Sequence, residues 1–146
     1  MTLRISLSTS TVLCTFRLFK NDFNFPTYLD CVPMTIRVAF TKLRLSSHPL
    51  RVETGRNASN TTPYNERYCL ICNSIDLEDE YHFLLICNMY TDIRRKYINT
   101  YYYKTPSVLK FIDLVQSTDA TVLNNLCKYV YETFEKRVNV VNVVNM

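Results

Sequence analysis

The sequence contains very little glycine and few prolines. Of its 146 residues, one is glycine (Gly55) and five are proline. Tight β-hairpin turns usually need residues that tolerate a positive φ, and glycine adopts that conformation most readily. A protein built mainly from hairpins is therefore disfavoured, and we expect a mainly α-helical domain.

Long apolar segments are also missing. No hydrophobic run approaches the roughly 20 residues with which a helix crosses a bilayer, so we expect no membrane partner. The start of the chain makes a poor secretory signal, because serines and threonines interrupt the stretch that would have to be apolar. Its basic, Ser/Thr-rich composition resembles a mitochondrial transit peptide weakly. We expect an intracellular protein, nuclear or cytoplasmic, with mitochondrial import as the minor alternative.

The net charge of +4 is modest, but the charges are distributed unevenly. Residues 1–60 hold eight basic and three acidic side chains, and residues 91–146 hold eight and five. Between them, residues 61–90 hold one basic and five acidic side chains. Basic segments of this kind are compatible with a nucleic-acid partner, and an ordinary solvated surface explains them equally well.

Helical periodicity divides the chain into a start, a helical region and a tail. We expect an irregular or weakly helical lead-in over residues 1–26, a helical zinc-binding domain over 27–137 with its zinc unit at 66–90, and a tail over 138–146. The polar segment 48–66 predicts a loop.

Apolar residues recur at helical spacing in four segments of this region. They predict a helix from Pro33 to Ser46 or Ser47, a long central helix from near Glu80 to about Tyr101, and two C-terminal helices, one from Ser107 to Val115 and one capped by Asp119 or Ser117. The acidic run from Glu78 to Glu80 lies where the central helix would begin, and acids there favour the helix dipole. The predicted architecture is a small helical domain stapled by one metal site.

The clearest chemical signal is a cluster of three cysteines and one histidine. Cys69, Cys72, His82 and Cys87 follow the spacing Cys-x2-Cys-x9-His-x4-Cys. Three thiolates and one imidazole form the tetrahedral ligand set of a closed structural Zn²⁺ site, which has no open position for a substrate. The spacing therefore predicts a bound zinc ion that stabilises the fold. The alternative is a set of buried cysteines beside a core histidine.

The second ligand pair cannot lie on one face of a regular helix. His82 and Cys87 are five positions apart, which separates their side chains by about 140° around an α-helix. We therefore expect His82 at the start of a helix or a local distortion between the two residues. His48 is the only other histidine that can compete as a ligand. The remaining cysteines, Cys14, Cys31 and Cys127, have no partner at ligand spacing and predict small buried side chains.

Catalytic patterns are missing around the cluster. The His-x-Glu arrangement of zinc deaminases is absent at His82, and protein ligands fill all four coordination positions. The nearest approach to a Tyr-x-Asp-Asp polymerase signature, at Tyr90 to Ile93, lacks the adjacent carboxylates that bind two metal ions. We therefore predict that the chain is not an enzyme.

The residues around the cluster resemble a known family. The core Cys-x2-Cys followed by Glu-x-His-Phe-Leu-x3-Cys, read from Glu80, is similar to the zinc-binding region at the C-terminal end of reverse transcriptases of non-LTR retrotransposons. Segment 43–56, segment 111–114 and the helix ending at Arg137 extend the likeness to about residues 27–137. The resemblance implies a detached part of such a protein, which contacts RNA or DNA or docks against a polymerase portion.

Basic and aromatic residues on both sides of the cluster are candidates for contacts with RNA or single-stranded DNA. We expect phosphate contacts from the basic side chains and stacking of unpaired bases on tyrosine rings. The candidates are Arg44, Arg51, Arg56, Arg67, Arg94, Arg95, Lys96 and Tyr97. The alternatives are a solvated basic face with half-buried tyrosines, and a structural or protein-interaction domain or inactive retroelement remnant in which zinc only stabilises the fold.

Overall fold

A computed structural model describes residues 26–57 and 61–144, so the lead-in expected over residues 1–26 lies outside the described residues except for Pro26. The described residues are mainly helical, which confirms the expected fold class, and their one β-type pairing is an isolated bridge between Tyr68 and Leu77. The helices are α2 (Tyr28–Cys31), α3 (Met34–Arg44), α4 (Arg51–Asn57), α5 (Thr91–Tyr97), α6 (Thr100–Tyr103), α7 (Val108–Val115) and α8 (Ala120–Val144). Shorter turns are η1 (Tyr64–Glu66), the π turn η2 (His82–Ile86) and η3 (Asn88–Tyr90).

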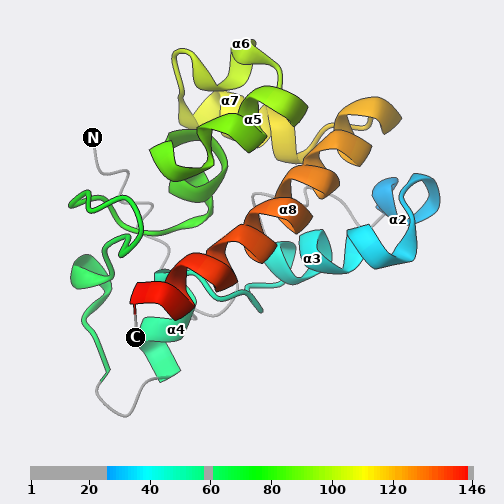
Figure 1. Cartoon of the computed structure of the whole chain (residues 1–146). Coiled ribbons are helices and arrows are strands. Elements are labelled where there is room, and N and C mark those ends of the chain that lie inside the picture. The colour runs from blue at the N-terminus through cyan, green and yellow to red at the C-terminus, as the bar shows by residue number, and fades with distance from the viewer. Residues whose placement is uncertain (1–25, 58–60, 145–146) are drawn as a thin grey trace, which may run out of the picture.

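Helix α8 organises the fold. It has 25 residues, a length of about 37 Å, and it continues through the segment expected to form the tail. Helices α2 and α3 pack along one side of it, while α5 packs along the other (Figure 1). Leu126, Tyr129 and Val130 of α8 are buried in the core between them. None of the helices in the described part of the chain combines the length and apolarity needed to cross a bilayer.

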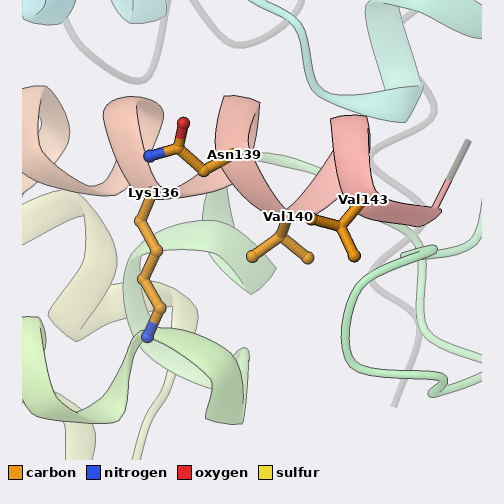
Figure 2. A pocket seen from close by; sticks show the side chains of 4 residues that line it. All are labelled: Lys136, Asn139, Val140 and Val143. Carbon is orange, nitrogen blue, oxygen red and sulfur yellow. The ribbon is translucent and has the colours of Figure 1, made fainter. Parts of the chain in front are cut away.

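The C-terminal end of α8 borders a hollow of about 300 Å³ (Figure 2). Val140 and Val143 point to the same side of the helix as Lys136, whose Nζ donates to the carbonyl of Met89 at 2.7 Å. That hydrogen bond ties α8 to η3. The lining is almost entirely apolar, so the hollow offers little polar chemistry for a site.

The predicted helices on either side of the central region are present. Helix α3 starts directly after Pro33 and buries Phe40 and Leu43, and the chain leaves it through Ser46 at a φ of 55°. Helix α7 starts after Ser107, whose Oγ accepts the backbone N–H of Lys110. Apolar spacing and capping residues were sufficient to predict both helices.

Both residues proposed as the cap of α8 take part in its start. Asp119 Oδ1 accepts the backbone N–H groups of Thr121 at 2.8 Å and Val122 at 3.0 Å. Ser117 Oγ in turn accepts the N–H of Asp119 at 3.2 Å. Two of the N–H groups that a helix start leaves unpaired are therefore satisfied by one carboxylate.

Replacing Asp119 with Ala is expected to lower the free energy of unfolding by about 1 kcal/mol, because both N–H groups lose their acceptor. Urea unfolding monitored by circular dichroism measures the loss. Asp119→Ser keeps an oxygen at the cap and should retain most of the stability. Equal losses in the two variants would contradict this role for the cap.

The long central helix predicted from near Glu80 to about Tyr101 is wrong. The chain instead forms η2, η3, α5 and α6, with extended backbone at Ile98 and a break at Cys87. The apolar stripe continues through these breaks because the short segments bury side chains in one common core. A stripe of this kind does not distinguish one long helix from several short ones.

The loop predicted over residues 48–66 is also partly wrong, because it contains helix α4. Leu50, directly before this helix, and Val52, within it, are both buried. Their apolar packing holds the helix against the core, although the composition of the segment is mostly polar. A Cβ on Gly55 would lie only 2.9 Å from side-chain atoms of Arg67. The single glycine of the chain therefore allows a close approach between α4 and the segment that leads to the cysteines.

Candidate metal centre

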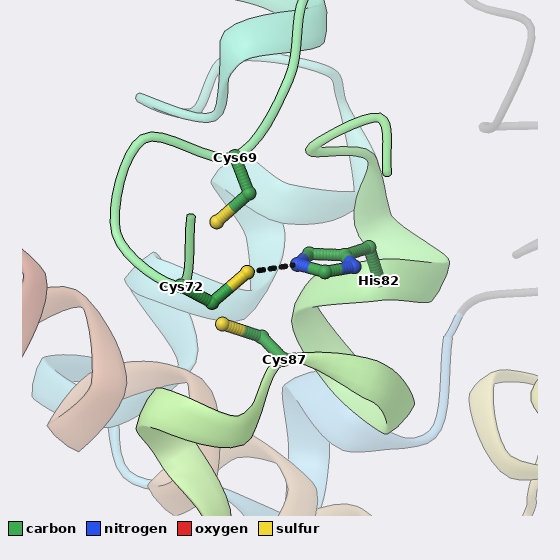
Figure 3. Close-up of side chains that lie close together, drawn as sticks. All are labelled: Cys69, Cys72, His82 and Cys87. Carbon is green, nitrogen blue, oxygen red and sulfur yellow. Dashed lines mark hydrogen bonds between the residues drawn. The ribbon is translucent and has the colours of Figure 1, made fainter. Parts of the chain in front are cut away.

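The four residues predicted as zinc ligands come together in the structure (Figure 3). The ligand atoms of Cys69, Cys72, His82 and Cys87 all lie within 4.8 Å of one another, which is close enough to hold a metal ion. Sγ of Cys72 lies 3.4 Å from Nε2 of His82. Two ligands of one tetrahedral zinc ion, at about 2.3 Å for sulfur and about 2.0 Å for nitrogen, would be about 3.5 Å apart. The contact therefore fits a shared metal.

A short knuckle, residues 68–77, presents the first ligand pair. The bridge between Tyr68 and Leu77 closes its base, and the backbone N–H of Cys69 donates to the carbonyl of Asp76 at 3.1 Å. Asn73 has a φ of 55°, a left-handed conformation that asparagine tolerates better than most residues. This residue lets the chain reverse directly after Cys72.

The π turn η2 presents the second ligand pair. The backbone N–H of Cys87 donates to the carbonyl of His82 at 2.8 Å, a bond that spans five residues instead of four. The wider turn brings together two side chains that a regular helix would hold about 140° apart. The local distortion expected between the two ligands is therefore confirmed. Asp79 caps the turn, because its Oδ1 accepts the backbone N–H of His82 at 2.8 Å.

The acidic run before His82 has a different role from the one predicted. Asp79 does cap the turn, as a charge at a helix start would, but Glu78 and Glu80 are buried and have other partners. Glu78 accepts from Nε and Nη2 of Arg137 at 3.1 and 2.7 Å, and from the backbone N–H of Arg51 at 2.9 Å. Burial raises the pKa of Glu78, and the nearby Arg137 opposes that rise. The pair ties the end of the knuckle to α8.

His48 does not belong to the cysteine cluster. It forms a separate group with Glu53 and Glu80, whose ligand atoms also lie within 4.8 Å of one another. Nε2 of His48 lies 2.8 Å from Oε1 of Glu80, which is hydrogen-bond distance, and Glu53 pairs with Arg56 at 2.8 Å. Because the carboxylates already have partners within the protein, this group is a set of polar contacts: the His48–Glu80 hydrogen bond and the Glu53–Arg56 ion pair of α4.

The thiols of Cys69 and Cys87 differ in acidity, because the hydrogen bond between them raises the pKa of Cys87, and burial adds to that rise. The hydrogen bond from Cys87, followed by the one from His82, lowers the pKa of Cys69. Thiolate is the form that binds a metal. Burial raises the pKa of Cys127 to about 12, and Cys127 is fully buried as expected. Cys31 was expected to be buried and is exposed, while Cys14 lies outside the described residues.

Three of the arginines predicted to contact phosphate lie inside the protein. Arg44, Arg67 and Arg94 are each less than 10% exposed. Arg67 donates to the carbonyls of Thr62 and Val52 at 2.9 and 2.8 Å, and the guanidinium of Arg44 lies over the ring of Tyr28. Arg94 likewise donates to the carbonyls of Leu84 and Cys87, so all three side chains are engaged inside the protein. We therefore withdraw these three residues as phosphate contacts.

The other candidates remain at the surface to different degrees. Arg51 and Arg56 are half-buried, and Arg56 is paired with Glu53. Arg95 and Lys96 are exposed on α5, beside the half-buried Tyr97. The structure thus separates the eight candidates into buried, partly engaged and exposed residues.

Sequence reasoning missed two residues that shape the exposed part of this region. Lys110 of α7 places its Nζ 4.6 Å from the ring centroid of Tyr101, and Glu132 of α8 accepts a hydrogen bond from Lys96 at 3.0 Å. The hydroxyl of Tyr97 also donates to Glu132. The Lys96 and Glu132 contact joins residues 36 positions apart, so no local pattern could have indicated it.

Comparison of the chain with protein-family models, with curated proteins and with solved structures gives no significant match. The function proposed for the chain therefore rests on its ligand geometry, on its surface chemistry and on the sequence resemblance around the cluster.

Proposed function

We propose that the chain is a zinc-stabilised module that binds RNA or single-stranded DNA and has no active site of its own. We further propose that it corresponds to the C-terminal zinc-binding region of non-LTR retrotransposon reverse transcriptases. The ligand set supports zinc, because three thiolates and one imidazole suit this ion and leave no open position. Nδ1 of His82 has no hydrogen-bond partner among the described residues, and a carboxylate oxygen of Asp76 lies 3.9 Å away. Metal-bound histidines commonly donate the N–H of their second ring nitrogen to a carboxylate.

The observation that carries the binding proposal is a group of exposed and half-buried cations and aromatic rings on α5, on α7, and on α6 and the residue after it. Nζ of Lys96 lies 4.8 Å from the ring centroid of Tyr97, and Lys110 lies similarly over Tyr101. We call this the α5–α7 surface and define it by Arg95, Lys96, Tyr97, Tyr101, Lys104 and Lys110. Single-stranded nucleic acid combines phosphates, which attract cations, with unpaired bases, which stack on aromatic faces. The surface offers both kinds of contact.

Reversing two charges on this surface is expected to weaken binding to single-stranded RNA. Arg95→Glu with Lys104→Glu changes two exposed cations, so we expect about a tenfold or greater loss at moderate salt and a shallower salt dependence. Electrophoretic titration against an unstructured RNA over a salt series measures both. Lys42→Glu, on α3 at the opposite side of α8, is the control and should have little effect.

Three results would contradict the proposal: no binding by the unaltered chain, binding that is indifferent to salt, or an equal loss in the control. About three phosphate contacts predict a slope of about −2 for the logarithm of affinity against that of salt.

A second candidate function is docking onto a protein partner, such as a polymerase portion. Two large apolar side chains on the knuckle favour it, because Leu70 is 58% exposed and Ile75 is 86% exposed. Apolar side chains that form an exposed patch often mark contact surfaces, and both of these belong to one short segment. Under this alternative, zinc only stabilises the fold, and the α5–α7 surface binds no RNA. An inactive retroelement remnant would also bind no RNA.

A further inference from the structure

A cavity of about 210 Å³ lies beside the α5–α7 surface, between the corner of α5 and α6 and the first half of α8. Its apolar wall includes Ile98, Leu114 and Leu126, all of them buried. No ligand of the metal centre lines it. The cavity is therefore separate from the metal centre, and it shares Tyr97 with the α5–α7 surface.

Two tyrosines line the cavity, and ring contacts connect each of them to a lysine. Tyr97 lies under Nζ of Lys96. The ring of Tyr102 makes an edge contact with Tyr101 at a centroid distance of 5.2 Å, and Lys110 lies over Tyr101. One lysine thus contacts a tyrosine of the lining, and a second, which also donates to Thr105, contacts the tyrosine next to it. Cations near aromatic rings suit a base and the phosphates that flank it.

Polar side chains complete the lining. Asn99, Thr121 and Asn125 contribute amide and hydroxyl groups, which both donate and accept hydrogen bonds. Oδ1 of Asn99 accepts the backbone N–H of Tyr101 at 2.9 Å, which leaves its amide nitrogen as a donor. An apolar wall with a few mixed donors and acceptors matches a flat heteroaromatic ring that has polar edges.

The volume of the cavity and the charges near it limit which chemical group it can hold. Cavities for drug-sized molecules usually measure about 300–1,000 Å³, so this one suits a single base better than a whole nucleotide. Carboxylates also lie near the lining tyrosines: Glu132 accepts a hydrogen bond from Tyr97, and burial, followed by Asp113, Tyr101 and Asp119, raises the pKa of Tyr102. These charges disfavour a phosphate inside the cavity but not an uncharged ring.

We propose that this cavity holds one unpaired nucleobase of a bound single strand, whose sugar–phosphate backbone passes Lys96 and Lys110. The inference rests on the nucleic-acid-binding function proposed above and adds the place where a base is held. It predicts that affinity depends on the presence of bases as well as on phosphate charge.

A substitution that fills the cavity should separate the contribution of the bases to affinity from that of the phosphate charges. Val122 lines the cavity from α8, and Val122→Phe adds volume there without changing any charge. Fluorescence anisotropy with a labelled oligouridylate should show binding about tenfold weaker, near the loss of one stacked base. Binding to an abasic strand of the same length should not change. Val138→Phe is the matched control, because Val138 lies on the same helix, is 54% exposed and does not line the cavity.

A second variant keeps the test decisive if Val122→Phe disturbs folding, which circular dichroism would reveal. Asn125→Ala removes only an amide from the lining, and it should also weaken oligouridylate binding while leaving abasic binding unchanged. If the unaltered chain binds both strands equally and neither variant changes this, the cavity inference is overturned while the proposed function stands. If the unaltered chain shows no salt-dependent binding to either strand, both are overturned.

Discussion

Removing the metal from the purified chain is expected to unfold the knuckle and to destabilise the whole domain. Structural zinc contributes about 10–16 kcal/mol of apparent binding free energy in zinc-finger peptides, whereas whole domains are stable by only about 5–15 kcal/mol. Besides the metal ligands, the knuckle is closed by one β-bridge and by short-range hydrogen bonds such as that from Cys69 to Asp76. A strong chelator should therefore lower the thermal midpoint sharply and expose the segment from Cys69 to Cys87 to protease.

The loss should extend from the knuckle to α8. Glu78 at the end of the knuckle is held by Arg137 of α8 through two hydrogen bonds, and both side chains are buried. A buried charge that loses its partner costs about 3–5 kcal/mol. Displacement of Glu78 would leave Arg137 buried without its carboxylate, so we expect the helical signal of α8 to fall together with that of the knuckle.

Single substitutions of the ligands should reproduce the effect of the chelator. Cys69→Ser and His82→Ala each remove one ligand of the cluster and should lower both the metal content and the thermal midpoint. Cys31→Ser changes an exposed cysteine outside the cluster and is the control, with no expected effect. Thermal unfolding of the three variants, with and without chelator, makes the comparison. Unchanged midpoints in the ligand variants would refute the role of the metal as a staple.

Replacing Arg94 with Met is expected to lower the free energy of unfolding by about 3 kcal/mol or more. Its Nε donates to the carbonyl of Leu84 at 2.7 Å, and its Nη2 donates to that of Cys87 at 2.9 Å. Nη2 also lies 3.4 Å from the carbonyl of Phe83. These carbonyls belong to the π turn and to the ligand that follows it. Each buried acceptor left unpaired costs about 1–3 kcal/mol.

The neighbouring arginine provides a matched control for this substitution. Arg95 is exposed on the same helix, so Arg95→Met should change stability by less than about 0.5 kcal/mol. Urea unfolding compares the two variants. Because Arg94 also anchors the backbone of Cys87, the Arg94 variant should bind metal more weakly in a competition with a chromogenic chelator. Equal stability of the two variants would show that Arg94 does not support the turn.

The metal centre and the α5–α7 surface are connected through the chain. Helix α5 starts at Thr91, directly after the last ligand Cys87 and the turn η3, so the position of Cys87 fixes where α5 begins. Under the proposed function, the metal orients the nucleic-acid-binding surface without contacting the ligand. Metal removal should then abolish RNA binding along with the fold.

The features that could be predicted from the sequence are those set by local chemistry. The spacing of the four ligands predicted their convergence, and the angle between His82 and Cys87 on a regular helix predicted the distortion that η2 provides. Capping residues predicted the starts of α7 and α8. In each case, residues within a few positions of one another determine the geometry.

The features that could not be predicted depend on partners far apart in the chain. Arg137 and Glu78 are 59 positions apart, and Arg94 contacts Tyr129 over 35 positions. Because these partners are distant in the sequence, the residues next to an arginine do not indicate whether it is buried or exposed. The breaks around Cys87 were hidden because the stripe of apolar residues continues through them. Tertiary packing, which a single sequence does not display, decides both.

X-ray absorption at the zinc edge of the purified chain tests the central claim most directly, because it reports the ligands of the bound ion. A site formed by Cys69, Cys72, His82 and Cys87 predicts one zinc per chain, with three sulfur atoms at about 2.3 Å and one nitrogen at about 2.0 Å. The Cys69→Ser variant should lose zinc or replace one sulfur. A shell made only of oxygen and nitrogen, or a folded chain without zinc, would contradict the account.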